Sequence, residues 1–372
     1  MEKYYSLRSL RLCGLCVILM ASRTAINLNY IPDGNVLLEL YMIEEHPFAQ
    51  YIRTLGKGKR GQRSLTQEEA CTAVKLILDG KVEDIQLGAF LMLMRVKEET
   101  PAEIAGFVQA IQETISLPDK MPQVSVDLSS YAGKRRQLPW FILSALLLSQ
   151  NGQAVFMHGQ TRDDERVYAE AALDCLGISA CTSFKEVATQ LNKNGFAYMG
   201  IEYISPLLDR MIELRQLLGL RSPGHTIARS LNPLNAKLTM QGIFHPGFAA
   251  MHQQAAHLLD QPLAAVFKGE GGEVERDPDR HAIVHGLAEG GLYEEEWPPI
   301  FQSATRHVKE ESLDLQLFRS VWLGEKEHEY GEAAVISTTA IAIKSLGLAD
   351  TQQAALDLAG QWWSARVSQQ AA

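Results

Sequence analysis

The chain has 372 residues, of which 46% are hydrophobic and 21% charged, which excludes an intrinsically disordered protein. The formal net charge of −9 argues against nucleic acid as a partner, although a basic stripe on an acidic protein still attracts phosphates. The five cysteines are sparse and odd in number, which excludes a disulfide framework and favours a reducing, cytoplasmic location.

The first 41 residues differ in character from the rest, and they do not enter the fold prediction. Basic residues precede an apolar run from Leu12 to Met20, a pattern typical of a signal peptide and too short to span a membrane. Met42 opens a sequence typical of a natural start, so we favour a wrongly chosen start codon over an export signal. Cys13 and Cys16 form an isolated CxxC, which is weak evidence for zinc.

Residues 42–118 are expected to form a helical domain. Capping boxes at Thr66–Glu69 and Thr100–Glu103 predict two helix starts, the second with proline at the first helical position. Asp79-Gly80 is expected to end the first of these helices. The nearly uninterrupted apolar stretch from Ile85 to Met94 predicts a buried helix.

Residues 119–372 are expected to form an α/β domain, because short apolar strands are spaced by helices, which implies a mainly parallel sheet. Leu138–Leu148 predicts an apolar helix opened by Pro139, in which we expect Trp140 to be a core residue. Ligands on such sheets lie beyond the carboxyl ends of the strands. The predicted strands are Val124–Leu128, Ala154–Met157, Phe196–Met199 and Ala264–Phe267.

Several motifs, in this order and spacing, resemble those of the anthranilate phosphoribosyltransferases, or glycosyltransferase family 3. They are Arg215–Arg221, Asn232–Asn235 and Gly242–Pro246, within a similarity that runs from about residue 48 to about residue 365. The resemblance implies a small helical domain joined to a larger α/β domain of the nucleoside phosphorylase/phosphoribosyltransferase type. It also implies that a segment near residues 200–220 packs on the helical domain.

Three motifs that make this family an enzyme are altered. The glycine-rich GTGGD loop, which cradles the phosphates of phosphoribosyl pyrophosphate, corresponds to Ser129–Gln137, where only Gly133 remains. In the K-H-G-N-R motif the lysine is Met157, while His158 survives and Arg162 stands one position late. The Asp-Glu pair that holds magnesium is reduced to Glu275.

The altered motifs resemble those of the YbiB-like branch of the fold, which is described as DNA-binding. The shared features are a Tyr/Gly/Lys-Arg loop, an M/V-H-G turn, the segment Gly219–Thr226 and the turn Gly272–Val274. This resemblance implies a homodimer that binds nucleic acid without sequence preference and needs no cofactor.

Basic residues gather where the resemblance places the cleft. Such runs are usually solvated surface, but here a second cluster lies in the phosphate loop itself. Tyr131, in that loop, is as consistent with base stacking as with packing, and Arg215 is also consistent with holding an aromatic acid. The candidate nucleic-acid contacts are Arg53, Lys57, Lys59, Arg60, Arg63, Tyr131, Lys134, Arg135, Arg136, His158, Arg162, Arg215 and Arg221, with no catalytic residue assigned.

Three hypotheses follow. The favoured one is a DNA-binding protein that is not an enzyme, holding phosphates on basic loops of the cleft. The alternative is a phosphoribosyltransferase with a remodelled donor site, in which Mg²⁺ would be needed. The third is an oligomeric scaffold for another protein, to which no residue points. The sequence does not distinguish DNA from RNA, or single from double strands.

Overall fold

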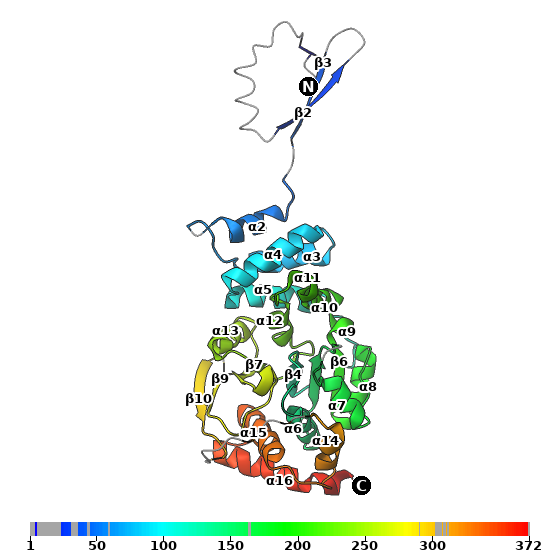
Figure 1. The fold of residues 1–372 in the computed structure, drawn as a ribbon, viewed down its shortest axis with the longest axis vertical. Coiled ribbons are helices and arrows are strands. Elements are labelled where there is room, and N and C mark those ends of the chain that lie inside the picture. The colour runs from blue at the N-terminus through cyan, green and yellow to red at the C-terminus, as the bar shows by residue number, and fades with distance from the viewer. Residues whose placement is uncertain are drawn as a thin grey trace. The chain divides into compact units, whose positions relative to one another are not determined.

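The computed structural model describes residues 4–5, 24–30, 36–42, 45–58, 60–162, 165–289, 291–301, 307, 310 and 312–370 (Figure 1). Residues 1–50 and 51–372 form two compact units, and each is described by itself. In the first unit, β2 (Thr24–Tyr30) and β3 (Val36–Met42) pair as an antiparallel hairpin, and β1 (Tyr4–Tyr5) pairs with β3. The signal-like run and the CxxC lie outside the described residues.

The helical domain begins with elements that the sequence predicts well. In both predicted capping boxes the threonine side chain accepts from the glutamate N–H, and the glutamate side chain accepts from the threonine N–H. Asp79 caps the C-terminus of its helix and Gly80 follows with a φ of 67°, as expected. The helices are α2 (Ala49–Gly56), α3 (Gln67–Leu78), α4 (Asp84–Lys97) and α5 (Pro101–Gln112).

The prediction of a wholly buried helix at residues 85–94 is wrong in part. Four side chains of α4 are buried, but Ile85 is 83% exposed, because only one stripe of a surface helix faces the core. The chain returns to this helix after residue 200, as the resemblance implied. Arg210 of α10 (Pro206–Glu213) forms an ion pair with Asp84 at 2.6 Å.

The α/β domain is built on a seven-stranded sheet in the order β10-β9-β8-β7-β4-β5-β6. Strands β4 to β8 run parallel and β9 and β10 antiparallel, which confirms the mainly parallel sheet. The four predicted strands are present, and β7, β9 and β10 were not predicted. The bounds are β4 (Val126–Ser130), β5 (Val155–Gly159), β6 (Phe196–Gly200), β7 (Leu238–Ile243), β8 (Leu263–Lys268), β9 (Ala282–Ala288) and β10 (Gly291–Trp297).

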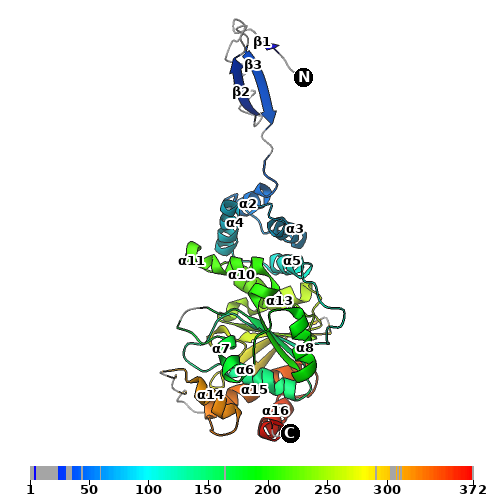
Figure 2. The same cartoon turned by 90° about the vertical axis from the view of Figure 1, so that its right-hand side faces the viewer.

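Helices cover both faces of the sheet, and strands β4, β5 and β6 are buried along their whole length (Figure 2). Along β8, Ala265 and Phe267 join the main core with α6 (Trp140–Gln150) and α15 (Glu329–Ser345). The alternate residues of β8, Ala264 and Val266, pack on the other side in two clusters with residues of α13 (Ala249–Leu258). Trp140 is fully buried in the main core, which confirms its predicted role.

The remaining helices connect the strands and close the C-terminal end of the domain. Of the helices in the described part of the chain, none is long and apolar enough to cross a membrane. They are α7 (Ala169–Cys175), α8 (Phe184–Asn194), α9 (Ile201–Ile204), α11 (Arg215–Leu218), α12 (Gly224–Arg229), α14 (Leu315–Trp322) and α16 (Gln352–Gln370), with the short 3₁₀ turns η2 (Pro246–Phe248) and η3 (Glu270–Gly272).

Close packing of α3 on α5 gives a stability prediction. A Cβ at Gly106 of α5 would overlap the Gln67 carbonyl and lie 2.8 Å from Ala70 Cβ. Gly106→Ala should therefore lower the free energy of unfolding by about 1–3 kcal/mol. Gly360→Ala in α16, where nothing lies within 4 Å of the new Cβ, should raise it by about 0.5–1 kcal/mol. Urea unfolding of both variants measures this, and equal effects would contradict the packing described.

Candidate functional site

The loop after β4 is closed by a carboxylate from within the chain. Glu273 is buried, and its Oε1 accepts the backbone N–H groups of Ala132 at 2.7 Å and Gly133 at 2.6 Å. Burial raises the pKa of Glu273, although Arg229 and these two hydrogen bonds oppose the rise. Backbone amides of this loop, which the family resemblance assigns to phosphate, are thus occupied by an internal anion.

Lys134, in the same loop, lies inside the protein. Its ammonium forms ion pairs with Glu270 and, at 2.7 Å, with Glu275, and its side chain is 0% exposed. Burial alone would lower the pKa of Lys134, but the two carboxylates outweigh it and the net shift is upward. Burial raises the pKa of Glu275 to about 7, against the pull of Lys134. The prediction that Lys134 contacts a ligand phosphate therefore needs correction, because its charge is already neutralised internally.

The residues at the family's magnesium position do not fit a magnesium ion. Glu275 Oε1 faces the Lys134 ammonium and Oε2 accepts the Phe141 N–H at 3.0 Å, so both oxygens are used. The neighbouring position of the metal pair is Val274, which is buried in the core. Magnesium prefers several oxygen ligands in near-octahedral geometry, and these two positions do not offer them.

Tyr131 and His158 are also buried rather than facing solvent. The Tyr131 hydroxyl lies 2.6 Å from His158 Nδ1, and His158 Nε2 lies 3.3 Å from Asp127 Oδ2. The two rings pack edge to face with centroids 5.5 Å apart. The predictions that Tyr131 stacks on a base and that His158 contacts a phosphate are therefore corrected. Both side chains are buried, and they pack against each other.

Arg221 lies close enough to four other arginines for their charges to act on it. This arginine cluster is formed by Arg162, Arg166, Arg215, Arg221 and Arg229. Burial, followed by the fields of the other four, lowers the pKa of Arg221 to about 10. Within the described ranges, Arg215, Arg221 and Arg229 have no ion-pair partner. Of the others, Arg162 donates to the Ile212 carbonyl and Arg166 donates to the Ala132 carbonyl.

A cavity of about 160 Å³, here called the arginine pocket, opens beside this cluster. Arg221 and Arg229 line it with Arg95 of α4, and burial and the arginines lower the pKa of His225, so its imidazole is neutral. Glu99 also lines the pocket, but burial raises its pKa. Phe244, His245 and Phe248 also line it. The pocket thus has three arginines and one carboxyl group in its lining.

The other predicted basic residues lie on the surface. Arg53, Lys57 and Arg60 are exposed, as are Arg135 and Arg136, while Lys59 lies outside the described residues. Two of these side chains have acidic partners: Arg63 forms a double hydrogen bond with Glu69, and Arg135 pairs with Glu165 at 3.2 Å. None of the described residues of the 53–63 loop lines the arginine pocket. The structure therefore brings together Arg162, Arg215 and Arg221, but not the two basic loops with them.

Sequence reasoning did not assign Arg95 and Phe244, which line the pocket, or Arg166, which belongs to the arginine cluster. Arg162 and Arg166 are four residues apart, which was the one local signal available for Arg166.

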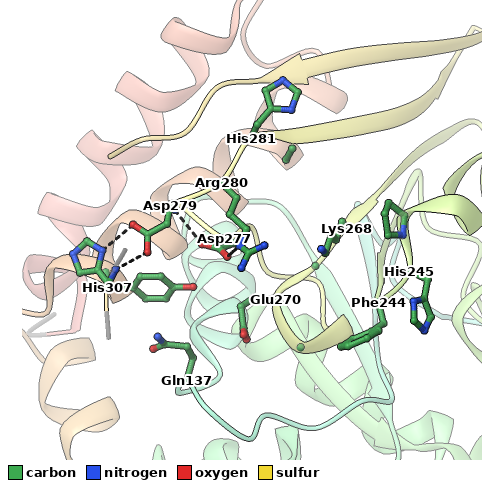
Figure 3. Close-up of a pocket in the computed structure, with 15 residues that line it drawn as sticks. Gln137, Phe244, His245, Lys268, Glu270, Asp277, Asp279, Arg280, His281 and His307 are labelled. Carbon is green, nitrogen blue, oxygen red and sulfur yellow. Dashed lines mark hydrogen bonds and ion pairs between the residues drawn. The ribbon is translucent and has the colours of Figure 1, made fainter. Parts of the chain in front are cut away.

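A second cavity, of about 330 Å³, is also lined by Phe244, together with Lys268, Asp277, Asp279 and Arg280 among others (Figure 3). In this cavity Asp279 Oδ1 lies 2.9 Å from His307 Nδ1, and Arg280 Nε lies 2.9 Å from Asp277 Oδ2.

The buried position of Lys134 gives a pH-dependent prediction. Lys134→Met leaves Glu270 and Glu275 without their cation and should cost about 3–5 kcal/mol at pH 8. The pKa of Glu275 is already raised to about 7, and losing Lys134 raises it further, so its ionisation destabilises the folded state. The cost should therefore be smaller at pH 5 and grow as the pH rises. Lys75→Met, which breaks an exposed pair with Glu113, is the control and should cost about 0–1 kcal/mol.

Chemical unfolding of both variants between pH 5 and pH 8 measures the two costs. A cost for Lys134→Met that does not change with pH would contradict the charge arrangement described.

Comparison with known proteins agrees with this architecture. Residues 49–115 match the helical bundle domain of the glycosyl transferase family. The chain is 32% identical over 235 residues to an uncharacterized protein of Aquifex aeolicus, covering 63% of this chain and 72% of that protein. It is 28% identical over 250 residues to YbiB of Escherichia coli, covering 66% and 78%. The anthranilate phosphoribosyltransferase of Aquifex aeolicus is 28% identical over 231 residues, covering 62% and 68%.

Among solved structures, the anthranilate phosphoribosyltransferase of Thermus thermophilus superimposes with a TM-score of 0.69 at 19% identity, covering 88% of this chain and 100% of that one. The Saccharomyces cerevisiae enzyme in complex with PRPP and Mg gives a TM-score of 0.69 at 14% identity, covering 88% and 99%. These structural matches establish the fold alone. Together with the sequence relatives, they show that the chain carries the helical bundle domain of the glycosyl transferase family and is a YbiB-like homologue with the anthranilate phosphoribosyltransferase fold.

Proposed function

We propose that the chain binds nucleic acid without sequence preference, and that the arginine cluster supplies the phosphate contacts. The observation that carries this proposal is the convergence of five arginines beside a pocket: burial first, and then the charges of the other four, lower the pKa of Arg221 to about 10. Crowding like charges costs stability unless an anion offsets it. A bound phosphate would remove that cost, and the guanidinium group matches phosphate with two parallel hydrogen bonds.

Closure of the β4 loop favours this function over phosphoribosyl transfer. A transferase needs the loop amides and a metal for the diphosphate, whereas here Glu273 and Lys134 occupy both positions. The transferase remains the second candidate because of the identity with the Aquifex aeolicus enzyme. In that case the arginine cluster would hold a small anion, and Mg²⁺ would have to displace Lys134.

Phosphate contacts of this kind carry no base information, so binding should depend on charge and not on sequence. The contact with nucleic acid would extend beyond the cluster to five exposed basic residues, Arg53, Lys57, Arg60, Arg135 and Arg136. The thiols of Cys71, Cys175 and Cys181 are free, which supports a reducing compartment such as the cytoplasm.

Two half-buried arginines of the cluster provide the test. Arg215→Ala/Arg221→Ala should weaken binding of a fluorescent single-stranded oligonucleotide and lower the slope of log K against log salt by about 1.4, or 0.7 for each lost phosphate contact. The charge-matched control is Lys185→Ala/Lys193→Ala, which removes two exposed cations of α8 that do not line the pocket. Fluorescence anisotropy across a salt series measures both slopes. An unchanged slope in the cluster variant would refute this site.

We further propose that the chain is a homodimer through an exposed apolar surface on α4 and α11. Three large apolar side chains are exposed there: Ile85 is 83% exposed, Leu217 84% and Leu220 52%. They lie on neighbouring elements, since a Cβ at Gly88 of α4 would be 4.0 Å from the Leu218 side chain. Isolated exposed leucines are ordinary, but several together on one surface typically mark an interface.

A charge placed on this surface tests the dimer. Leu217→Glu should convert the protein to a monomer in light scattering, because the carboxylate would lose its water in the interface. Leu348→Glu, at a leucine 43% exposed elsewhere, should leave the assembly unchanged. A wild-type protein that is monomeric at micromolar concentration, or a Leu217→Glu variant that remains dimeric, would overturn the proposed interface.

A further inference from the structure

Phe244 is an exposed aromatic ring at the place where this fold presents ligands. It follows β7 directly, at the carboxyl end of the strand, and is 58% exposed. Its ring packs edge to face on His245, with centroids 4.9 Å apart, which holds it beside the sheet edge. An exposed, positioned aromatic ring is the feature on which an unpaired base stacks.

Phe244 separates two cavities, each of which has cations on its own side. It lines the arginine pocket together with Arg221 and Arg229. It also lines the second cavity, where Figure 3 shows Phe244 and Lys268 on the side away from the Asp279–His307 pair. The two residues are neighbours in the sheet, because Lys268 is the register partner of Ile243, the residue before Phe244.

The charges of the second cavity leave Lys268 available for an anion. Its three acids already have internal partners: Glu270 pairs with Lys134, Asp277 with Arg280, and Asp279 with His307. His281 faces Glu296 at 3.4 Å. Among the residues that the structure describes, Lys268 is exposed and makes no ion pair with a carboxylate. A second phosphate therefore has a cationic partner on the far side of Phe244.

We propose that Phe244 stacks on one unpaired base, with the flanking phosphates held by the arginine pocket on one side and by Lys268 on the other. The site would therefore select single-stranded over double-stranded nucleic acid. A duplex keeps its bases paired and stacked, so none can lie on the ring. Arg229, 9% exposed at the base of a pocket of about 160 Å³, is within reach of a flexible strand and not of a rigid duplex. This inference rests on the proposed nucleic-acid function.

Removing the ring tests the inference. Phe244→Ala in the full chain should weaken binding of a 20-nucleotide single-stranded DNA by roughly 5-fold to 100-fold, as expected for one lost base stack. Binding of a duplex of the same length should change less than about twofold, since it makes only phosphate contacts. Phe244→Trp, which keeps a stacking surface, should retain the affinity. Leu258→Ala, at a leucine 41% exposed on α13, is the control for loss of an apolar side chain.

Two further measurements separate stacking from charge. The fluorescence of 2-aminopurine placed in the strand should be quenched by the wild type and not by Phe244→Ala. Lys268→Ala should leave the quenching in place and lower the salt slope by about 0.7, the value for one phosphate contact on a single strand.

The outcomes distinguish this inference from the function on which it rests. A wild-type protein that binds no nucleic acid at low salt would overturn both. If the arginine-cluster variant loses affinity while Phe244→Ala binds single strands as the wild type does, the stacking site fails and the proposed function stands. An equal loss of single-strand and duplex affinity in Phe244→Ala would overturn the preference for single strands.

Discussion

The arrangement of the site depends on the ion pairs and hydrogen bonds that the loop after β4 makes with glutamates of the same chain. Lys134 brings a buried ammonium between Glu270 and Glu275, and Glu273 accepts the amides of Ala132 and Gly133. A buried charge is tolerated only when it is paired and hydrogen-bonded, so these contacts hold the loop against η3 and α6. Breaking any one of them would leave an unpaired ion in the core.

This closure moves the site for external anions away from the loop. The amides and the cation that would face phosphate in the family are bound within the chain, and the arginine cluster lies outside this loop. The cluster borders a pocket between α4 of the helical domain and α12 of the α/β domain. On the proposed function, the same scaffold would bind anions in this pocket through these arginines.

Local signals in the sequence were sufficient for much of the fold. The two capping boxes, the glycine stop at Gly80 and the buried Trp140 helix follow from contacts within a few residues, and all are present. Strands β9 and β10 were not predicted because β10 carries three glutamates and β9 is interrupted by His285 and Gly286, so neither has the continuous apolar run of the parallel strands. The resemblance supplied the domain architecture that local patterns do not determine.

The site was harder to predict, because its interactions join distant segments. Three consecutive cations at residues 134–136 are typical of an exposed basic loop, yet Lys134 is paired with glutamates 136 and 141 residues further along the chain. Neighbouring Arg135 and Arg136 remain exposed. The convergence of Arg162, Arg215 and Arg221 was anticipated only through the resemblance.

The most direct measurement is binding of a fluorescent single-stranded oligonucleotide to the full chain, with phosphoribosyl pyrophosphate and Mg²⁺ added as competitors. If the β4 loop is closed by its own carboxylate and lysine, the oligonucleotide should bind tightly at low salt. Millimolar sugar phosphate should then displace it equally well with and without the metal. Displacement by micromolar phosphoribosyl pyrophosphate only when Mg²⁺ is present would show that Lys134 yields to the metal and that the donor site is intact.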